Sequence, residues 1–290
     1  MIKLTNNIEE ANAITHAGTF HTDEVLSTVI LSKVFENITV FRANNIQENM
    51  NIKPNTIIYD IGLGEFDHHQ KGGNGKRENG VPYAACGLIW KKFGKEIVKN
   101  YENSEIIWKI IDKKLIQPID ADDNGVFPTL DYPIQNLTFS NIISGFNPKW
   151  DNENDNQNDS FIKAVEFATI VFENALENAI SQAKAYFIIK EALEKSENNI
   201  MILNEHLPWK ETLFEIDNPK AKDLLFVVYP SNRGGYNWQC VPESIGSFGQ
   251  KKSVPSEWKG LYGEELQKIS GISTARFCHP NGFIGRCRNI

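Results

Sequence analysis

Imidazole and carboxylate side chains, the ligands that manganese and other borderline divalent ions accept, cluster in four short segments of this chain. The segments are THAGTFHTDEVLSTVI (residues 15–30), IIYDIG, EFDHHQ and PIDADDNG. Their candidate ligands are His16, His21, Asp23, Asp60, Asp67, His68, His69, Asp120, Asp122 and Asp123. A single histidine is usually a hydrogen-bonded structural residue, but four of the six histidines fall in two of these acidic segments. Because one ion needs fewer ligands, the pattern predicts a site for two divalent ions.

Strand and helix patterns alternate around these segments. The short apolar runs NAIT, NITVF and NTIIYDIG have the length and β-branched content of strands, and the helical pattern DEVLSTVILSKVF separates the first two. This order predicts a parallel sheet with crossover helices. Ligands of open α/β sheets bind at the carboxyl ends of the strands, where Asp60 is expected. Two further helices are predicted in AACGLIWKKFGKEIV and NSEIIWKIIDKKLI.

A long helical pattern divides the chain into two predicted domains. Apolar residues recur at helical spacing across residues 160–196, after the polar segment DNENDNQNDS (151–160), which is predicted to be a solvated loop. Short β-like runs follow. We therefore predict an α/β fold in which a parallel-sheet catalytic domain, residues 1–197 including the connector helix, precedes a smaller α/β substrate-binding domain, residues 198–290.

The composition argues against several classes of protein. A formal net charge of −7 disfavours loose, charge-driven binding to nucleic acid or anionic membranes, so a polyanionic substrate must meet local cations or bound metal. The four cysteines are scattered without a C-x-x-C pair, which indicates neither a disulfide framework nor a structural zinc site. No targeting segment and no membrane-spanning apolar stretch is recognisable. We expect a cytoplasmic protein without membrane contact, and the sequence leaves a homo-oligomer open.

Two features near the first ligands are interpreted as structural. In the glycine-rich segment KGGNGKRENG, Arg77 follows Lys76 where a phosphate-binding P-loop has Ser or Thr. We interpret this segment as a solvated loop in which Lys71, Lys76 and Arg77 are exposed. Glu24 is interpreted as a first-turn helix residue that the helix dipole favours, rather than as a proton-transfer group.

The C-terminal segment RFCHPNGFIGRCRNI has the features of an anion-binding loop. Its glycines allow the backbone to approach a ligand closely, and its three arginines suit bidentate phosphate contacts. The predicted substrate-binding residues are His279, Gly282, Gly285, Arg286 and Arg288. Phe283 and Trp238 are either base-stacking rings or ordinary core aromatics.

Sequence blocks along nearly the whole chain resemble the melanocyte-proliferating-gene family of the DHH phosphoesterase superfamily. The blocks are THAGTFHTDE, YDIG, FDHHQ, AACGLIW and IDADDNG in the first part, and NPKW, PWKETLF, WQCVP and FCHPNGFIG in the second. The first motif of this superfamily commonly has two aspartates two residues apart, and His21 stands here in place of the first one. Arg286 stands where the family pattern has glycine.

The resemblance implies a two-domain DHH-type hydrolase with two manganese or magnesium ions. It implies that one ion is bound by His16, His21 and Asp60. It implies that the other is bound by Asp23, Asp60, His68 and Asp120, with Asp122 or Asp123 as alternatives to Asp120. Asp67 would then support the histidines, His69 would face the substrate phosphate, and Asp123 would assist Asp120. A histidine at position 21 favours manganese over magnesium.

The residues by themselves predict a metal-dependent phosphoester or phosphoanhydride hydrolase. Two ions about 3.5–4 Å apart lower the pKa of a shared water and neutralise charge in the transition state. The resemblance implies a 3′ to 5′ exonuclease that acts on RNA or short oligonucleotides. The alternatives are a pyrophosphatase or small-nucleotide phosphodiesterase, and a catalytically silent metal- and RNA-binding protein.

Overall fold

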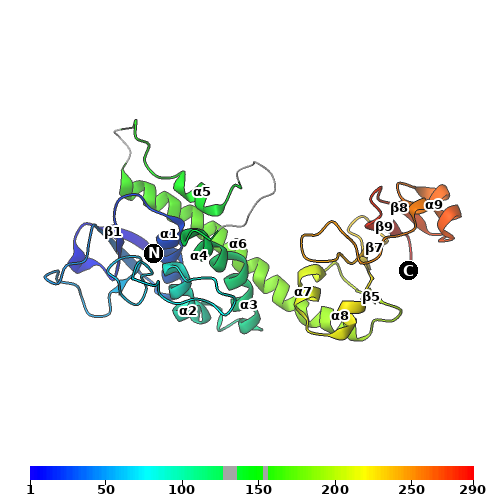
Figure 1. The fold of residues 1–290 in the computed structure, drawn as a ribbon, viewed down its shortest axis with the longest axis horizontal. Helices are drawn as coiled ribbons and strands as arrows, with labels where there is room; N and C mark the ends of the chain where they lie inside the picture. The colour runs from blue at the N-terminus through cyan, green and yellow to red at the C-terminus, as the bar shows by residue number, and fades with distance from the viewer. Residues whose placement is uncertain (127–135, 153–155) are drawn as a thin grey trace. The chain divides into compact units, whose positions relative to one another are not determined.

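A parallel β-sheet forms the first part of the chain in the computed structural model (Figure 1). The structure describes residues 1–126, 136–152 and 156–290. Within these residues the sheet has the strand order β1-β3-β2-β4. Its strands are β1 (Ile2–Thr5), β2 (Ala13–His16), β3 (Ile38–Ala43) and β4 (Ile57–Ile58). Every neighbouring pair runs parallel, which confirms the predicted parallel sheet.

The register of this sheet brings two predicted ligands to one edge. Ile14 of β2 pairs with Ile58 of β4, so His16, the last residue of β2, is level with Asp60. β2 has neighbours on both sides, and its residues before His16 are all buried. An inner parallel strand of this kind reads as a continuous apolar run rather than an alternating one.

The helices of this part pack around α1 (Thr22–Val34). α1 contacts α2 (Ala85–Val98), and α4 (Gln117–Asp123) contacts both. Every residue of α1 from Thr22 to Leu31 is buried, so this helix is enclosed and shows no single apolar stripe. The other helical segments here are η1 (Ile8–Glu10), α3 (Ser104–Ile111), the π-helical η2 (Asp112–Ile116) and α5 (Phe139–Ser144).

The predicted connector is the single helix α6 (Gln157–Glu194), which is the long green helix of Figure 1. Its 38 residues give a length of about 57 Å at about 1.5 Å per residue. The loop prediction for 151–160 is wrong at its end, because α6 already begins at Gln157; residues 153–155 lie outside the described part. The side-chain oxygen of Asn156 accepts hydrogen bonds from the backbone N–H groups of Asn158 and Asp159, at 2.8 and 3.3 Å. This cap allows polar residues to form the first turn.

A mixed sheet forms the second part of the chain. Its described strands have the order β5-β6-β7-β9-β8, with β5 parallel to β6 and the other pairs antiparallel. The strands are β5 (Ile200–Ile202), β6 (Phe226–Pro230), β7 (Tyr236–Cys240), β8 (Ala275–Cys278) and β9 (Ile284–Cys287). The helical segments are α7 (Trp209–Glu215), α8 (Pro219–Asp223), η3 (Ser256–Trp258) and α9 (Gly263–Ser270). This arrangement confirms the predicted second α/β part.

Two compact units make up the chain, Met1–Ile180 and Ser181–Ile290. The division falls inside α6, because its last turns pack into the second core through Ala185, Ile189 and Leu193. The predicted boundary between residues 197 and 198 stays a prediction. Within the described residues, no helix has the length and apolar content needed to span a membrane.

Candidate metal centre

His16 faces two carboxylates at the edge of the first sheet. Its Nε2 lies 3.0 Å from Glu24 Oε1 and 3.3 Å from Asp60 Oδ2. Its Nδ1 donates to the carbonyl of Ala17 at 3.1 Å. A ligating histidine commonly donates its second ring N–H in this way, which leaves Nε2 for a cation.

His21 and Glu24 complete this corner of the site. His21 caps the N-terminus of α1, and its backbone N–H donates to both oxygens of Glu24 at 2.9 and 3.0 Å. Glu24 is therefore held fully buried and pointing back at His16. His16, His21 and Glu24 each offer a ligand atom, and these atoms lie within 4.8 Å of one another. The interpretation of Glu24 as a helix-dipole residue missed this contact, although a glutamate three residues after a helix cap was the available signal.

A second group of candidate ligands forms around His68. Its Nε2 lies 3.0 Å from Asp123 Oδ2. Its Nδ1 lies 3.7 Å from Asp23 Oδ2 and 3.7 Å from Asp60 Oδ1. Asp23, His68 and Asp123 offer ligand atoms within 4.8 Å of one another. Asp60 contacts both His16 and His68 and so lies between the two groups.

The donor set fits divalent cations. Asp60 Oδ1 and His68 Nδ1 are buried and have no hydrogen-bond partner among the described residues, and buried polar atoms in this state are costly unless a ligand meets them. Asp60 also has a left-handed backbone with φ of 56°, a conformation that persists in a non-glycine residue only when its surroundings demand it. Two ions with Asp60 between them would satisfy both orphaned atoms.

The negative charge of the clustered carboxylates also favours the binding of cations. Burial raises the pKa of Asp23 well above its usual range, and the nearby charges of Asp60, Asp123 and Asp120 add to this effect. Burial opposes protonation of His16, but its hydrogen bonds to Asp60 and Glu24 outweigh burial and raise its pKa to about 10. Without metal, a proton on His16 therefore offsets part of the negative charge. Divalent ions would supply this positive charge directly.

Asp67 and His69 stand beside these groups. Asp67 accepts hydrogen bonds from the backbone N–H groups of Leu63 at 2.6 Å and His69 at 3.0 Å, and from Nδ1 of His69 at 2.8 Å. Burial would raise the pKa of Asp67, but these hydrogen bonds outweigh it and lower the pKa. The His69 side chain is 59% exposed, and its Nδ1 lies 3.5 Å from Asp60 Oδ1. The supporting role of Asp67 and the phosphate-facing role of His69 stay predictions.

Asp120 has other partners in the structure. Its Oδ2 lies 2.6 Å from Nη1 of Arg77, and its Oδ1 accepts the backbone N–H of Gly87 at 2.9 Å. A Cβ on Gly87 would lie only 1.9 Å from the Asp120 carboxylate, so this contact requires glycine. Asp123, three residues later on α4, is the aspartate that reaches His68. Asp120 also offers a ligand atom within 4.8 Å of those of Asp23 and Cys86. Among the described residues, Asp122 lines the cavity without entering any such group.

The expectation that Arg77 is solvated is wrong. Its side chain is only 8% exposed, since it donates to both oxygens of Asp112 at 3.0 and 2.8 Å and also to Asp120. Its guanidinium lies 4.4 Å from the ring centre of Tyr83. Two acidic partners and an aromatic ring replace the water that a surface arginine would bind. Lys71 and Lys76 of the same segment are exposed, as expected.

A cavity of about 450 Å³ opens onto the ligands. α5 forms one wall with Ser140, Asn141 and Ser144, which the sequence analysis did not single out. Ser140 and Ser144 are four residues apart and so lie on the same face of the helix. The cavity is lined by His21, Thr22, His68, His69, Asp122, Asp123, Ser140, Asn141 and Ser144.

The predicted substrate-binding residues of the second unit lie on strand β9, in the turn before it, or directly after it. Gly282 has φ of 70°, and its N–H donates to the carbonyl of His279 at 2.7 Å to close the turn. Glycine is required at position 285 for a different reason than expected. A Cβ there would lie 1.9 Å from the indole of Trp238. Close packing against this ring, rather than approach to a ligand, requires the glycine. A substrate-binding role for His279, Gly282, Gly285, Arg286 and Arg288 stays a prediction.

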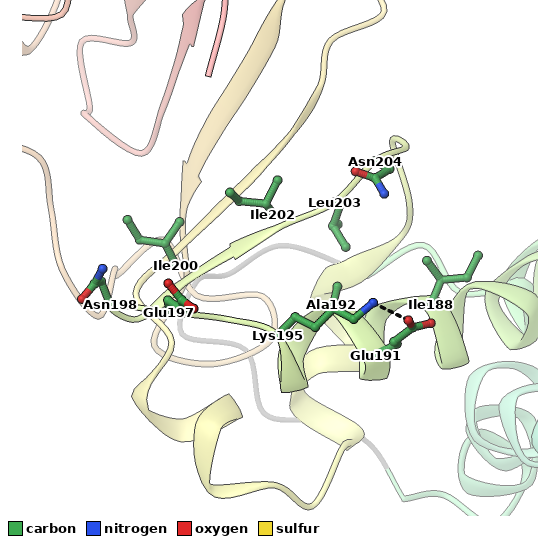
Figure 2. A pocket seen from close by; sticks show the side chains of 10 residues that line it. All are labelled: Ile188, Glu191, Ala192, Lys195, Glu197, Asn198, Ile200, Ile202, Leu203 and Asn204. Carbon is green, nitrogen blue, oxygen red and sulfur yellow. Dashed lines mark hydrogen bonds and ion pairs between the residues drawn. The ribbon is translucent and has the colours of Figure 1, made fainter.

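The second unit also has a pocket away from these predicted substrate-binding residues. Figure 2 shows it between the end of α6 and β5, with one ion pair between Lys195 and Glu191 at 2.5 Å. Its other lining side chains include the exposed Ile200 and Ile202 of strand β5. No histidine stands among the described residues that line it.

Comparison with known proteins shows that the chain is similar to the members of one protein family. The model of a family described as "Uncharacterised protein family (UPF0160)", with the short name MYG1_exonuc, matches residues 12–290. The "MYG1 protein" of Dictyostelium discoideum is 30% identical over 300 residues, which cover 93% of this chain and 90% of that protein. The "MYG1 protein YER156C" of Saccharomyces cerevisiae is 27% identical and covers 99% and 94%. The "MYG1 exonuclease" of Mus musculus is 27% identical and covers 93% and 80%. No solved structure matches the chain significantly.

Proposed function

This chain belongs to the MYG1 family (UPF0160), and we propose that it is a metal-dependent phosphodiester hydrolase that acts as a 3′ to 5′ exonuclease on RNA or short oligonucleotides. The observation that carries the proposal is the buried Asp60, which lies between two groups of metal ligands. The name "MYG1 exonuclease" of the mammalian relatives and the resemblance to the DHH superfamily support it. We place the activity in the cytoplasm.

We propose one ligand set for each ion. The first ion is held by His16, His21 and Asp60, with Glu24 beside them. The second ion is held by Asp23, Asp60 and His68, and Asp123 completes this group in place of Asp120, because Arg77 already binds Asp120. The two imidazoles of the first set favour manganese over magnesium, which prefers oxygen ligands.

The chemistry follows from the donor set. When bound, the ions would lower the pKa of an attacking water and neutralise charge that develops on the phosphate. The residues of the chain would hold these ions and orient the substrate. His69 is fixed through Nδ1 by Asp67, so its other nitrogen is available to donate to a phosphate oxygen. Ser140 and Ser144 of α5 offer hydroxyl groups to the same cavity.

The remaining substrate contacts are proposed in the second unit. Arg286 and Arg288 have the planar donors that bind phosphate oxygens, and His279 adds a further donor. The net charge of −7 favours short, clamped substrates over long duplexes.

Hydrolysis of a 5′-labelled RNA oligonucleotide by metal-stripped protein tests the proposal, with manganese, magnesium or no metal added. A manganese-dependent ladder that shortens from the 3′ end is expected. Asp60→Asn should abolish it, whereas Asp217→Asn, at an exposed site, should not. Release of phosphate from pyrophosphate alone would favour an anhydride hydrolase. RNA binding without hydrolysis under any condition would favour a silent binding protein.

A further inference from the structure

A second cavity lies in the C-terminal unit, between α7, the end of β7 and the turn before β9. It has a volume of about 330 Å³, the size range of small-ligand pockets. None of the five predicted substrate-binding residues lines it. The residues that matter for its chemistry are Lys210, Glu211, Phe214, Gln239, Phe248, Asn281 and Phe283.

Aromatic rings from three separate segments line this cavity. Phe214 comes from α7, Phe283 directly precedes β9, and Phe248 belongs to the loop that follows β7. Phe248 is fully exposed, which is unusual for a phenylalanine and costs free energy in water. Flat apolar walls of this kind bind flat rings by stacking.

The loop that carries Phe248 has a defined shape. The backbone N–H of Glu243 donates to the carbonyl of Gly249 at 3.1 Å, and the backbone N–H of Gly249 donates to the hydroxyl of Ser247 at 2.9 Å. Pro242 and Gln250 form an isolated β-bridge at its base. The exposed Phe248 therefore belongs to a hydrogen-bonded loop at the edge of the cavity.

A buried amide adds polar specificity. Gln239 is only 6% exposed, and its side-chain oxygen accepts the hydroxyl of Tyr229 at 2.8 Å. Within the described part of the chain, its side-chain nitrogen has no hydrogen-bond partner, although the residue lines the cavity. If the amide were turned by 180°, the oxygen would be the unpartnered atom. Either way, one polar atom of a buried side chain is left for a ligand.

Lys210 supplies a positive charge at this site. Its side chain is exposed and lines the cavity. Lys251, another lysine nearby in the sequence of the loop, instead donates to the carbonyls of Ala221 and Lys222 at 2.9 and 2.8 Å. Among the described residues that line the cavity, Lys210 is thus the cation that suits a phosphate attached to a bound ring.

We propose that this cavity binds the nucleobase of a nucleotide at the end of the substrate. That the bound ring is a nucleobase rests on the proposed nuclease function. The phenylalanines stack on the base, Gln239 and Asn281 contact its polar edge, and Lys210 binds the adjoining phosphate. Single-stranded nucleic acids are recognised by this combination of stacking, edge contacts and cations.

Titration calorimetry on the full, metal-stripped chain in EDTA tests the inference without relying on hydrolysis. The ligands are AMP, CMP, GMP and UMP, with ribose 5-phosphate as the probe that lacks a base. The mononucleotides should bind at least tenfold more tightly than ribose 5-phosphate. Phe248→Ala and Lys210→Ala should each weaken mononucleotide binding about tenfold, and both positions are exposed, so the fold should survive. Gln239→Glu should change the preference among the four bases.

The matched control is Ile202→Ala, an exposed apolar position in the other pocket of the same unit (Figure 2). This variant should bind nucleotides like the wild type. Equal binding of ribose 5-phosphate and the mononucleotides, or unchanged binding in both the Phe248 and Lys210 variants, would overturn the inference even if the RNA ladder is observed. Base-dependent binding with no hydrolysis of RNA would uphold the cavity and refute the proposed function.

Discussion

Replacement of Arg77 by methionine should strongly destabilise the first unit. The variant keeps an unbranched side chain but leaves Asp120, which is fully buried, without its charged partner and with backbone N–H groups such as that of Gly87 as donors. Removal of one partner from a buried ion pair costs about 3–5 kcal/mol, because the remaining charge stays desolvated. Arg77 is 8% exposed and Asp112 is 18% exposed, so most of this cost should be retained.

The cost should depend on pH. Burial raises the pKa of Asp120 to about 7, above its unfolded value. A raised pKa in the folded state means that protonation of Asp120 stabilises the protein at low pH, and that this contribution is lost as the pH rises through about 7. Loss of Arg77 removes a group that lowers this pKa. The penalty should therefore be large at pH 8 and small at pH 5, where the carboxyl group is protonated in both proteins.

Urea unfolding of metal-stripped protein at these two pH values measures the effect. Lys76→Met is the matched control, since Lys76 is the exposed neighbour in the same segment and should change stability by less than about 0.5 kcal/mol. In the double variant, Asp120→Asn should recover part of the loss caused by Arg77→Met. If Arg77→Met were no more costly at pH 8 than Lys76→Met, the buried-pair argument would be refuted.

Three further perturbations test other parts of the structure. Asp123→Asn should weaken manganese binding about 10- to 100-fold in calorimetry, whereas Asp120→Asn should mainly affect stability; equal losses would contradict the choice of Asp123. Gly285→Ala should destabilise the second unit by about 1–3 kcal/mol in thermal melts, since its Cβ would lie 1.9 Å from the Trp238 indole, and an unchanged melt would refute this packing. Burial raises the pKa of Cys240 to about 11, so alkylation of this thiol in the native protein should be slow at pH 8 and accelerate as the pH approaches 11, as peptide mapping would show.

Several features of the centre could be predicted from local sequence. The apolar run that ends at His16 and the run before Asp60 read as parallel strands, whose carboxyl ends meet at one edge of the sheet. The segment Asp67-His68-His69 supplied both the histidine at the centre of the second group and the carboxylate that holds His69. Such patterns are readable because strand direction and side-chain type depend on residues a few positions apart.

The choice between Asp120 and Asp123 could not be made from the sequence. The two residues are one turn apart on α4, so their spacing gives both a similar direction. The packing of α4 against α2 gives the two residues different partners, because it places Asp120 at the backbone N–H of Gly87 and Asp123 at His68. This contact joins residues 33 positions apart.

The sequence by itself therefore determined the chemical inventory of this protein: the types of ligand, the strands that end near them and the family to which the blocks belong. Only the tertiary structure decided the partners, turning Glu24 toward His16, burying Arg77 between Asp112 and Asp120, and setting Phe248 beside a cavity. The physical reason is distance along the chain. Backbone hydrogen bonding and periodicity act over a few residues, whereas burial and ion pairing depend on segments that meet only after the units have packed.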